Sequence, residues 1–214
     1  MKLVLAVAFF LVFFAASTAE AQLCAGATPF TQNPYQLGVG AAFRDGAQGV
    51  GGHFAAGGSS LFGGVDLSVV NFSDVDSTQT NIGVFAGSEL NVEQDTRVFI
   101  CPLAAITFGV GPDIGPVSIS SITLRGGGQV GIVASDSNDM MIVPTFGLAA
   151  AWQRVSAEVG DVDSDASDTF GVANLGVGFI FDRRIGITPG ISIPFSVGDS
   201  DVAFTIGFTF AFGS

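Results

Sequence analysis

The sequence carries little charge and lacks the long apolar runs of membrane helices. Charged residues make up 12% of its 214 residues, while hydrophobic residues make up 48%. A soluble domain typically carries about 25% charge, so much of the usual solubilising surface is missing. Beyond residue 21, no stretch approaches the roughly 18 consecutive apolar residues of a spanning helix. High hydrophobicity without such a run favours strands that alternate between lipid and a protein interior.

Basic residues and histidine are also scarce, which argues against nucleic-acid binding and against a histidine-dependent hydrolase. Seven Lys and Arg stand against 19 Asp and Glu, and a net charge of −12 argues against a nucleic-acid partner. A Ser–His–Asp hydrolase would have to use the one histidine, His53, with an acid such as Asp66, but no G-x-S-x-G motif supplies a nucleophile. Gly126-x-Gly128-x-x-Gly131 opens no helix of a βαβ unit, so no cofactor is indicated. We therefore expect a protein that is not an enzyme.

The N-terminus has the pattern of a secretory signal peptide over residues 1–21. Lys2 gives the positive start, residues 3–16 are apolar, and Ala19-Glu20-Ala21 fits a cleavage site. An uncleaved anchor is the alternative. In an exported protein the two cysteines, Cys24 and Cys101, suggest a disulfide that ties a periplasmic lead-in segment (residues 22–34) to the rest; two unpaired thiols are the alternative.

The end of the chain has the clearest pattern, a strict alternation of large and small residues. Even positions from 204 to 212 are Phe, Ile, Phe, Phe and Phe, and odd positions from 203 to 211 are Ala, Thr, Gly, Thr and Ala. In a strand, the large apolar side chains then share one face and the small uncharged ones share the other. A soluble sheet would carry charge on its second face, so the pattern favours a wall between lipid and a lumen.

Similar alternation along the chain predicts about ten strands, with eight as the alternative. They are expected at residues 35–44, 48–56, 61–72, 79–90, 97–110, 117–134, 141–157, 170–181 and 185–197, followed by a last strand that ends at 212. Gly126-Gly127-Gly128 and the prolines at 102, 144, 189 and 194 fall inside these strands and suggest bends or bulges. A sheet in hydrocarbon must close, since an open edge leaves backbone groups unpaired. The sequence therefore predicts an all-β protein: a closed antiparallel up-and-down transmembrane β-barrel over residues 35–214.

The residues Thr205-x-Gly207-x-x-Phe210-x-Phe212 resemble the C-terminal assembly signal of bacterial outer-membrane proteins. With the export signal and the alternation, the chain is similar to small barrels of the OmpX/OmpW size class. This resemblance implies a place in the outer membrane, among its lipid and lipopolysaccharide, and recognition of the signal by the barrel assembly machinery. Gly213 and Ser214 depart from the pattern, because the family usually ends on the aromatic residue. The family includes pores, adhesins, enzymes and structural proteins, so the resemblance does not select a function.

Polar residues on the non-lipid face of the predicted strands are expected to line the lumen. They are Arg44, His53, Asp66, Glu89, Arg97, Arg125 and Gln129, together with Gln36 and Asn81. In barrels such residues usually fill the lumen with ion pairs and hydrogen bonds, whereas the functional alternative is a narrow polar pore. The sequence therefore predicts an integral outer-membrane protein with a structural or narrow-pore role.

An acidic run lies in the loop expected at residues 160–168. It contains Asp161, Asp163, Asp165 and Asp168, but Ala166 and Val172 replace the glycine and glutamate of an EF-hand. These carboxylates remain candidate ligands for a divalent cation, and a solvated acidic loop is the alternative. Acidic outer loops also suggest a second function, surface binding or adhesion, for instance to lipopolysaccharide through bridging cations. The oligomeric state stays open.

Overall fold

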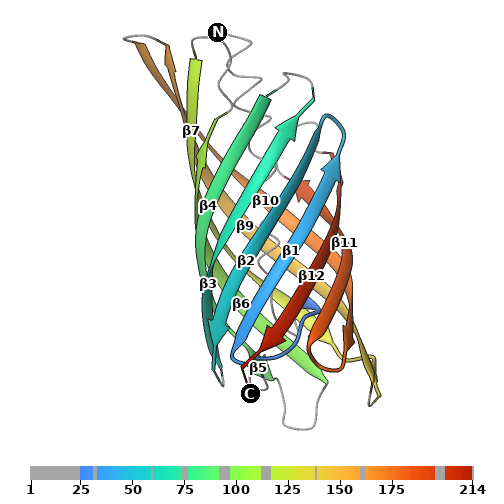
Figure 1. The fold of residues 1–214 in the computed structure, drawn as a ribbon. Helices are drawn as coiled ribbons and strands as arrows, with labels where there is room; N and C mark the ends of the chain where they lie inside the picture. The colour runs from blue at the N-terminus through green and yellow to red at the C-terminus, as the bar shows by residue number, and fades with distance from the viewer. Residues whose placement is uncertain are drawn as a thin grey trace.

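A computed structural model shows ten long antiparallel strands closed into a barrel (Figure 1). The structure describes residues 25–30, 33–58, 60–73, 77–91, 97–111, 117–137, 139–159, 162–195 and 201–213. The long strands pair in chain order, and the last one returns to pair with the first. Within these ranges, no helix is long and apolar enough to cross a membrane.

The prediction of ten strands, not eight, is confirmed. The long strands are β1 (Tyr35–Arg44), β2 (Ala47–Gly57), β3 (Leu61–Phe72), β4 (Ser77–Ser88), β6 (Val98–Val110), β7 (Val117–Ile132), β9 (Met140–Val159), β10 (Val162–Phe181), β11 (Ile185–Phe195) and β12 (Ala203–Phe212). Two short strands, β5 (Leu90–Asn91) and β8 (Ser135–Asp136), pair with β6 and β9. We call the end of the barrel with Phe212 the lower end and the opposite end, with the β1–β2 turn, the upper end (Figure 1).

The outward face of the wall is apolar, as the alternation predicts. Leu37, Val39 and Phe204 are 53%, 56% and 65% exposed, whereas the inward neighbours Gln36 and Ala211 are 0% and 1% exposed. The seam between β1 and β12 runs unbroken from Tyr35 opposite Phe212 to Phe43 opposite Phe204. A closed wall that exposes large apolar side chains around its girth satisfies its backbone internally and suits hydrocarbon rather than water. The fold is therefore a transmembrane β-barrel.

The bulges expected at glycine and proline are not present. Gly126 pairs with Ala104 and Ala150 in the same registers that continue past Gly127 and Gly128. The four strand prolines also leave the registers of β6, β9 and β11 unshifted. A proline removes one N–H donor, and here the ladder on either side stays in place. The prediction of bulges is wrong at these positions.

The hairpin of β9 and β10 differs most from the sequence prediction. A loop is expected at residues 160–168, but β10 begins at Val162 and pairs with β9 without interruption to Phe181 opposite Met140. Since β7 pairs with β9 up to Val117 opposite Val159, the three strands form a sheet that projects past the upper end (Figure 1). Asp and Ser replace apolar residues in this part of β10. The period-2 hydrophobic signal is therefore absent, although pairing with β9 continues.

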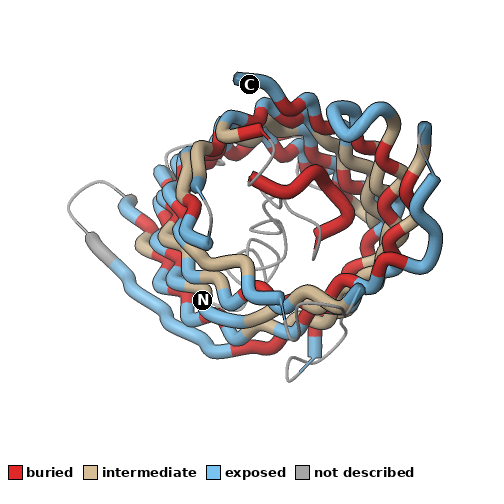
Figure 2. The backbone as a smooth tube through the Cα atoms, turned by 90° about the horizontal axis from the view of Figure 1, so that it is seen from below, coloured by how far each residue is buried: buried red, intermediate tan, exposed pale blue. Residues whose placement is uncertain are grey.

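Residues 25–30, which belong to the lead-in segment predicted at residues 22–34, lie inside the barrel. All six are buried, and Ala27 and Thr28 are fully so. Figure 2 shows the segment in red within the ring of strands. The expected signal peptide, residues 1–21, lies outside the described residues and stays a prediction.

Candidate functional site

Aromatic packing lines one side of the lower part of the lumen. The Phe30 ring stacks on Phe62 with centroids 5.5 Å apart and an interplanar angle of 16°. Ala55 and Phe85 complete the buried cluster. Gly57 is required beneath the Phe30 ring, because a Cβ at that position would lie 2.6 Å from Phe30 Cγ. The cluster attaches the N-terminal segment to the inner faces of β2, β3 and β4.

The N-terminal segment (residues 25–30) is also held against the wall by hydrogen bonds. The Gln36 side-chain amide donates a hydrogen bond to the Thr28 carbonyl oxygen. The Thr188 hydroxyl donates to the Gly26 carbonyl oxygen at 3.2 Å. Just after the segment, the Asn33 amide donates to the Arg183 carbonyl oxygen at 3.1 Å. Each contact satisfies a backbone carbonyl, and Gly26 also fits because it has no side chain: a Cβ there would lie 2.7 Å from Gly178 Cα.

An apolar cluster lines the upper part of the lumen. Its members are the inward-facing residues Ala42, Ala47, Val70, Phe72, Ile119, Val155 and Ala157. They come from β1, β2, β3, β7 and β9, strands that lie on more than one side of the barrel. Water-filled barrels carry a polar interior, so an apolar lining in the upper part of the lumen disfavours water there.

A network of Gln79, Asn81 and Ser121 lies at the level of the upper apolar cluster, since Gln79 pairs with Val70 and Ser121 pairs with Val155. Below it, between the two apolar zones, lies a polar middle zone that includes His53 and Asp66. The Gln79 amide donates to Asn81 Oδ1 at 2.8 Å and to Ser121 Oγ at 3.3 Å, and the Asn81 amide donates to Ser68 Oγ at 3.3 Å. Gly109 of β6 makes room beneath it, since a Cβ there would lie 2.3 Å from Gln79 Nε2. The network links β3, β4 and β7 along the inner wall, over Gly109 of the intervening strand β6.

His53 and Asp66 are neighbours on the β2–β3 ladder but do not form a catalytic pair. The His53 ring lies over Gly38 of β1, where a Cβ would come within 2.0 Å of its Cε1, and the Asp66 carboxylate lies over Gly83 of β4. Both ring nitrogens of His53 are buried without a hydrogen-bond partner among the described residues. The two side chains thus lean away from each other, and the hydrolase arrangement considered from the sequence is not assembled.

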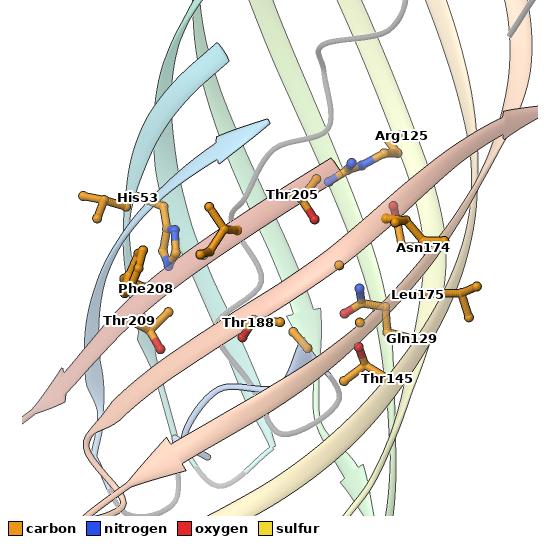
Figure 3. A pocket seen from close by; sticks show the side chains of 17 residues that line it. His53, Arg125, Gln129, Thr145, Asn174, Leu175, Thr188, Thr205, Phe208 and Thr209 are labelled. Carbon is orange, nitrogen blue, oxygen red and sulfur yellow. The ribbon is translucent and has the colours of Figure 1, made fainter. Parts of the chain in front are cut away.

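A cavity of about 80 Å³ lies in the middle of the lumen (Figure 3). His53 borders one side, and Arg125 and Gln129 of β7 border the other, while Ala25 of the N-terminal segment also contacts it. Its remaining polar lining consists of Thr145, Asn174, Thr188, Thr205 and Thr209. Sequence reasoning missed most of these residues, because single threonines on the small-residue face of a strand have no motif that distinguishes them.

The seven residues predicted to line the lumen divide into two groups. His53, Asp66, Arg125 and Gln129 lie in the polar middle zone. Arg44 ends β1 at the upper end within electrostatic range of Asp201, Glu89 lies between β4 and β5, and Arg97 precedes β6 and is exposed. All three lie near the rims of the barrel, where Arg44 Nε and Glu89 Oε2 are buried and Arg97 is exposed, and a lumen-lining role for them stays a prediction. The alternation along a strand predicts which side of the wall a residue faces, but not its height along the barrel axis.

The structure describes the side-chain contacts of two of the four aspartates in the acidic run. Asp165 accepts hydrogen bonds from Arg154 and Ser156, both at 2.6 Å. Asp168 accepts one from the backbone N–H of Thr169 at 2.7 Å. Asp161 and the side chain of Asp163 lie outside the described residues. Within the described part of the chain, no group of three or more His, Cys, Asp or Glu is placed to hold a metal ion, and a cation site here stays a prediction.

Two further predictions rest partly on residues that the structure does not describe. Cys101 is 3% exposed on the inner face of β6 and is not a free thiol. Cys24 lies outside the described residues, so its pairing with Cys101 stays a prediction. The residues of the assembly signal, Thr205, Gly207, Phe210 and Phe212, lie in β12 at the closing seam. Their recognition by assembly machinery also stays a prediction.

The closed ten-stranded wall and its apolar outer face define a small membrane β-barrel protein. No protein-family model matches the chain, and no curated protein matches it. Among solved structures it is similar to Neisserial surface protein A (13% identity, 84% of this chain and 97% of that chain covered, TM-score 0.45). It is also similar to Ail, the attachment invasion locus protein of Yersinia pestis (9%, 84% and 99%, 0.41), and to the KdgM porin (8%, 83% and 99%, 0.41). Identities this low transfer no function, which must follow from the residues of this chain.

Proposed function

We propose that this protein is an integral outer-membrane barrel with a structural role, whose lumen is closed by its own chain. The outer membrane follows from the predicted export signal and C-terminal motif, together with the apolar outward face. The observation that supports a closed lumen is the buried segment at residues 25–30, fixed by the Phe30–Phe62 stack and by hydrogen bonds to two of its carbonyls. The upper apolar cluster opposes water entry from the other end.

Single-channel recording in planar bilayers tests this role against the narrow-pore alternative. We expect no conductance steps from the folded protein, because the N-terminal segment lies in the lower lumen and an apolar cluster lines the upper lumen. A Phe30→Ala variant removes the ring that holds the segment against Phe62 and is expected to give intermittent steps. Folding of every sample is checked first by its resistance to unfolding in detergent.

Phe54→Ala is the matched control. Phe54 lies on β2, next to the strand β3 that carries Phe62, but its side chain faces outward and is 40% exposed. This substitution removes the same atoms without touching the lumen, so we expect it to be silent. Discrete, reproducible steps from the unaltered protein would overturn the closed-lumen role and establish a pore. Equal steps from both variants would show that lost wall packing, not the segment, controls conduction.

A second candidate function, surface binding, is favoured by the upper part of β10. Its pairing with β11 begins only at Gly171 opposite Phe195, so Val162–Phe170 pairs with β9 alone among the described residues. Residues 164–169 are exposed on both faces. A free strand edge offers alternate N–H and C=O groups to an extended peptide, and the aspartates favour a basic one.

Fluorescence anisotropy with an alternating Lys/Val peptide measures such strand addition. We expect saturable binding that is lost when two central residues of the peptide are replaced by proline, because proline removes backbone donors while the charge stays constant. Equal binding of the Lys/Val peptide and its proline variant would show that charge attraction alone accounts for the binding, and would reject strand addition.

A further inference from the structure

The upper edge of β10 extends beyond the connection between β11 and β12. Phe195 ends β11 opposite Gly171, and Asp201 lies just before β12. The five residues that join Phe195 to Asp201 must extend and turn back, so they reach only about two to three residues past Phe195. Residues 163–167 of β10 therefore lie beyond this connection, and residues 164–167 are exposed on both faces.

The sequence of this edge is complementary to itself in the antiparallel direction. When two copies pair about Ala166, each aspartate takes the position opposite a residue with a hydroxyl group, which can donate a hydrogen bond to a carboxylate. The opposed residues are Ala166 with Ala166, Asp165 with Ser167, Ser164 with Asp168, and Asp163 with Thr169.

Neighbouring registers lack this complementarity. Moving the centre of the pair by one residue places Asp165 opposite itself, and moving it by two places Asp163 opposite Asp165. Like charges directly opposite each other destabilise a sheet. A centre at Ser167 places Asp163 opposite Gly171, which already pairs with Phe195. The register with two alanines at its centre is therefore favoured.

The repulsion between two acidic edges is partly compensated within each copy. Arg154 forms an ion pair with Asp165 at 2.6 Å, so each copy brings a cation to the centre of the contact. Salt screens the charges of the other aspartates. We therefore expect self-pairing to strengthen as salt rises, whereas attraction of a basic peptide to the same edge weakens.

The symmetry of the pair determines where the second copy lies. Two antiparallel strands of one sheet that are related by two-fold symmetry have their axis perpendicular to the sheet. The sheet of β7, β9 and β10 continues the barrel wall past its upper end (Figure 1). The axis therefore lies in the plane of the membrane, and the rotation inverts the second barrel.

We propose that the edge of β10 around Ala166 pairs with the same edge of a second copy in an opposed membrane, so that the protein joins two membrane surfaces. This inference rests on the second candidate function, surface binding through that edge, and names its partner. One pair of short strands is weak in water. Many copies on each surface add their contributions, which stabilises the contact between two membranes.

Oxidative cross-linking of Ala166→Cys in phosphatidylcholine vesicles tests the proposal. The two introduced thiols lie directly opposite each other, where Cα atoms are about 4.5–5.5 Å apart and a disulfide can form. We expect a cross-linked dimer. Ser164→Cys is the matched control, exposed on the same face of β10, because two thiols at that position are roughly 14 Å apart in this register.

Dilution of the vesicles at a constant protein-to-lipid ratio shows whether the copies meet across two membranes. Contact between vesicles becomes rarer on dilution, whereas contact within one membrane does not change. We therefore expect the yield of dimer to decrease. An equal yield from Ala166→Cys and Ser164→Cys, or a yield that dilution leaves unchanged, would overturn the proposal.

Light scattering measures the contact without an introduced thiol. We expect vesicles that carry the unaltered protein to aggregate as salt rises, and Ser167→Asp to abolish aggregation, because it places a carboxylate opposite Asp165. Ser120→Asp adds the same charge to the outward face of β7, two strands from the edge, and is expected to aggregate normally. Equal scattering from the two aspartate variants would reject the pairing.

The Lys/Val peptide and the second copy occupy the same edge, so each partner can fail alone. Cross-linking without peptide binding would support the second copy and reject the basic peptide. Peptide binding without cross-linking would retain surface binding but reject the second copy. Failure of both would reject the edge as a binding surface.

Discussion

At the scale of single residues, glycine sets how closely neighbouring strands approach. A Cβ added at Gly127 would lie 2.3 Å from the Leu148 carbonyl oxygen and 2.6 Å from the Ala149 Cα, whereas one at Gly126 would meet nothing within 4 Å. We therefore expect Gly127→Ala to lower the free energy of unfolding by about 1–3 kcal/mol, because backbone atoms of β9 must shift.

Denaturant unfolding in lipid vesicles checks this prediction, with Gly126→Ala as the control in the adjacent position of the same strand. The control is expected to unfold at or above the denaturant concentration of the unaltered protein. Equal destabilisation of the two variants would point to loss of backbone freedom rather than to the close approach of β7 and β9.

The exposed Arg154–Asp165 pair gives a second prediction at this scale. Hydrogen bonds from Arg154 and then Ser156 lower the pKa of the Asp165 carboxyl below its ordinary value of 3.8. A carboxyl whose pKa is lower in the folded state stabilises the folded state at pH values above its pKa in the unfolded chain. This stabilisation is lost as the pH falls through the pKa of the folded state. Hydrogen exchange at the tip of the β9–β10 hairpin, corrected for intrinsic rates, should therefore stay constant from pH 7 to pH 5 and accelerate below about pH 4. An Asp165→Asn variant that shows the same acid step would assign the step to another carboxyl.

At the scale of elements, the upper apolar cluster should behave as a packed core. Val70 is 1% exposed in this cluster, so Val70→Thr buries a hydroxyl among apolar side chains. We expect a loss of about 1–3 kcal/mol in the free energy of unfolding. Val110→Thr is the control, because Val110 is 69% exposed and ends β6 near the upper rim. A smaller loss at Val70 than at Val110 would mean that water already reaches the cluster.

The elements also show what the sequence can predict. Membrane-facing strands can be predicted from the sequence, because lipid on one side of the wall requires an alternation of large apolar and small residues such as that from Phe204 to Phe212. Beyond the bilayer that constraint ends, so the polar start of β10 is predicted as a loop although β9 pairs with it. The N-terminal segment has no periodicity at all, and its place in the lumen depends on complementary features such as Gly57 beneath Phe30.

The candidate site is harder to predict than the wall. His53, Arg125 and Gln129 are found from the sequence because polar residues stand out on an inward face. The cavity between them depends on which strands face each other across the lumen and on missing side chains at Gly176, Gly190 and Gly207. The alternation of residues predicts which of them face the same side of the wall, but not which residues face one another across the lumen.

At the scale of the whole molecule, the outward face locates the membrane on the barrel. On β9 this face is apolar at Phe146 and Leu148 and turns charged after Trp152, at Arg154. On β10 it turns polar at Thr169, which lies opposite Trp152. Tryptophan is enriched at membrane–water interfaces. We therefore expect the sheet above this level to stand outside the bilayer and the wall below it to lie within the bilayer.

Lysine substitutions on the two sides of that boundary test the assignment. Phe208 is 44% exposed and lies mid-strand, opposite Val39 and Ile187. We expect Phe208→Lys to cost about 2–4 kcal/mol and to impair membrane assembly, because lysine at the bilayer midplane loses its hydration. Ser167→Lys on the projecting part of β10 is expected to cost about 0–1 kcal/mol.

Unfolding in vesicles and recovery in the membrane fraction measure both effects. Normal assembly and stability of Phe208→Lys would reject the lipid-facing assignment of β12, and with it the whole transmembrane reading of the barrel. A large cost for Ser167→Lys would instead raise the bilayer boundary above Trp152. The projecting sheet would then be embedded in lipid, and the free edge of β10 would be out of reach of any partner in solution.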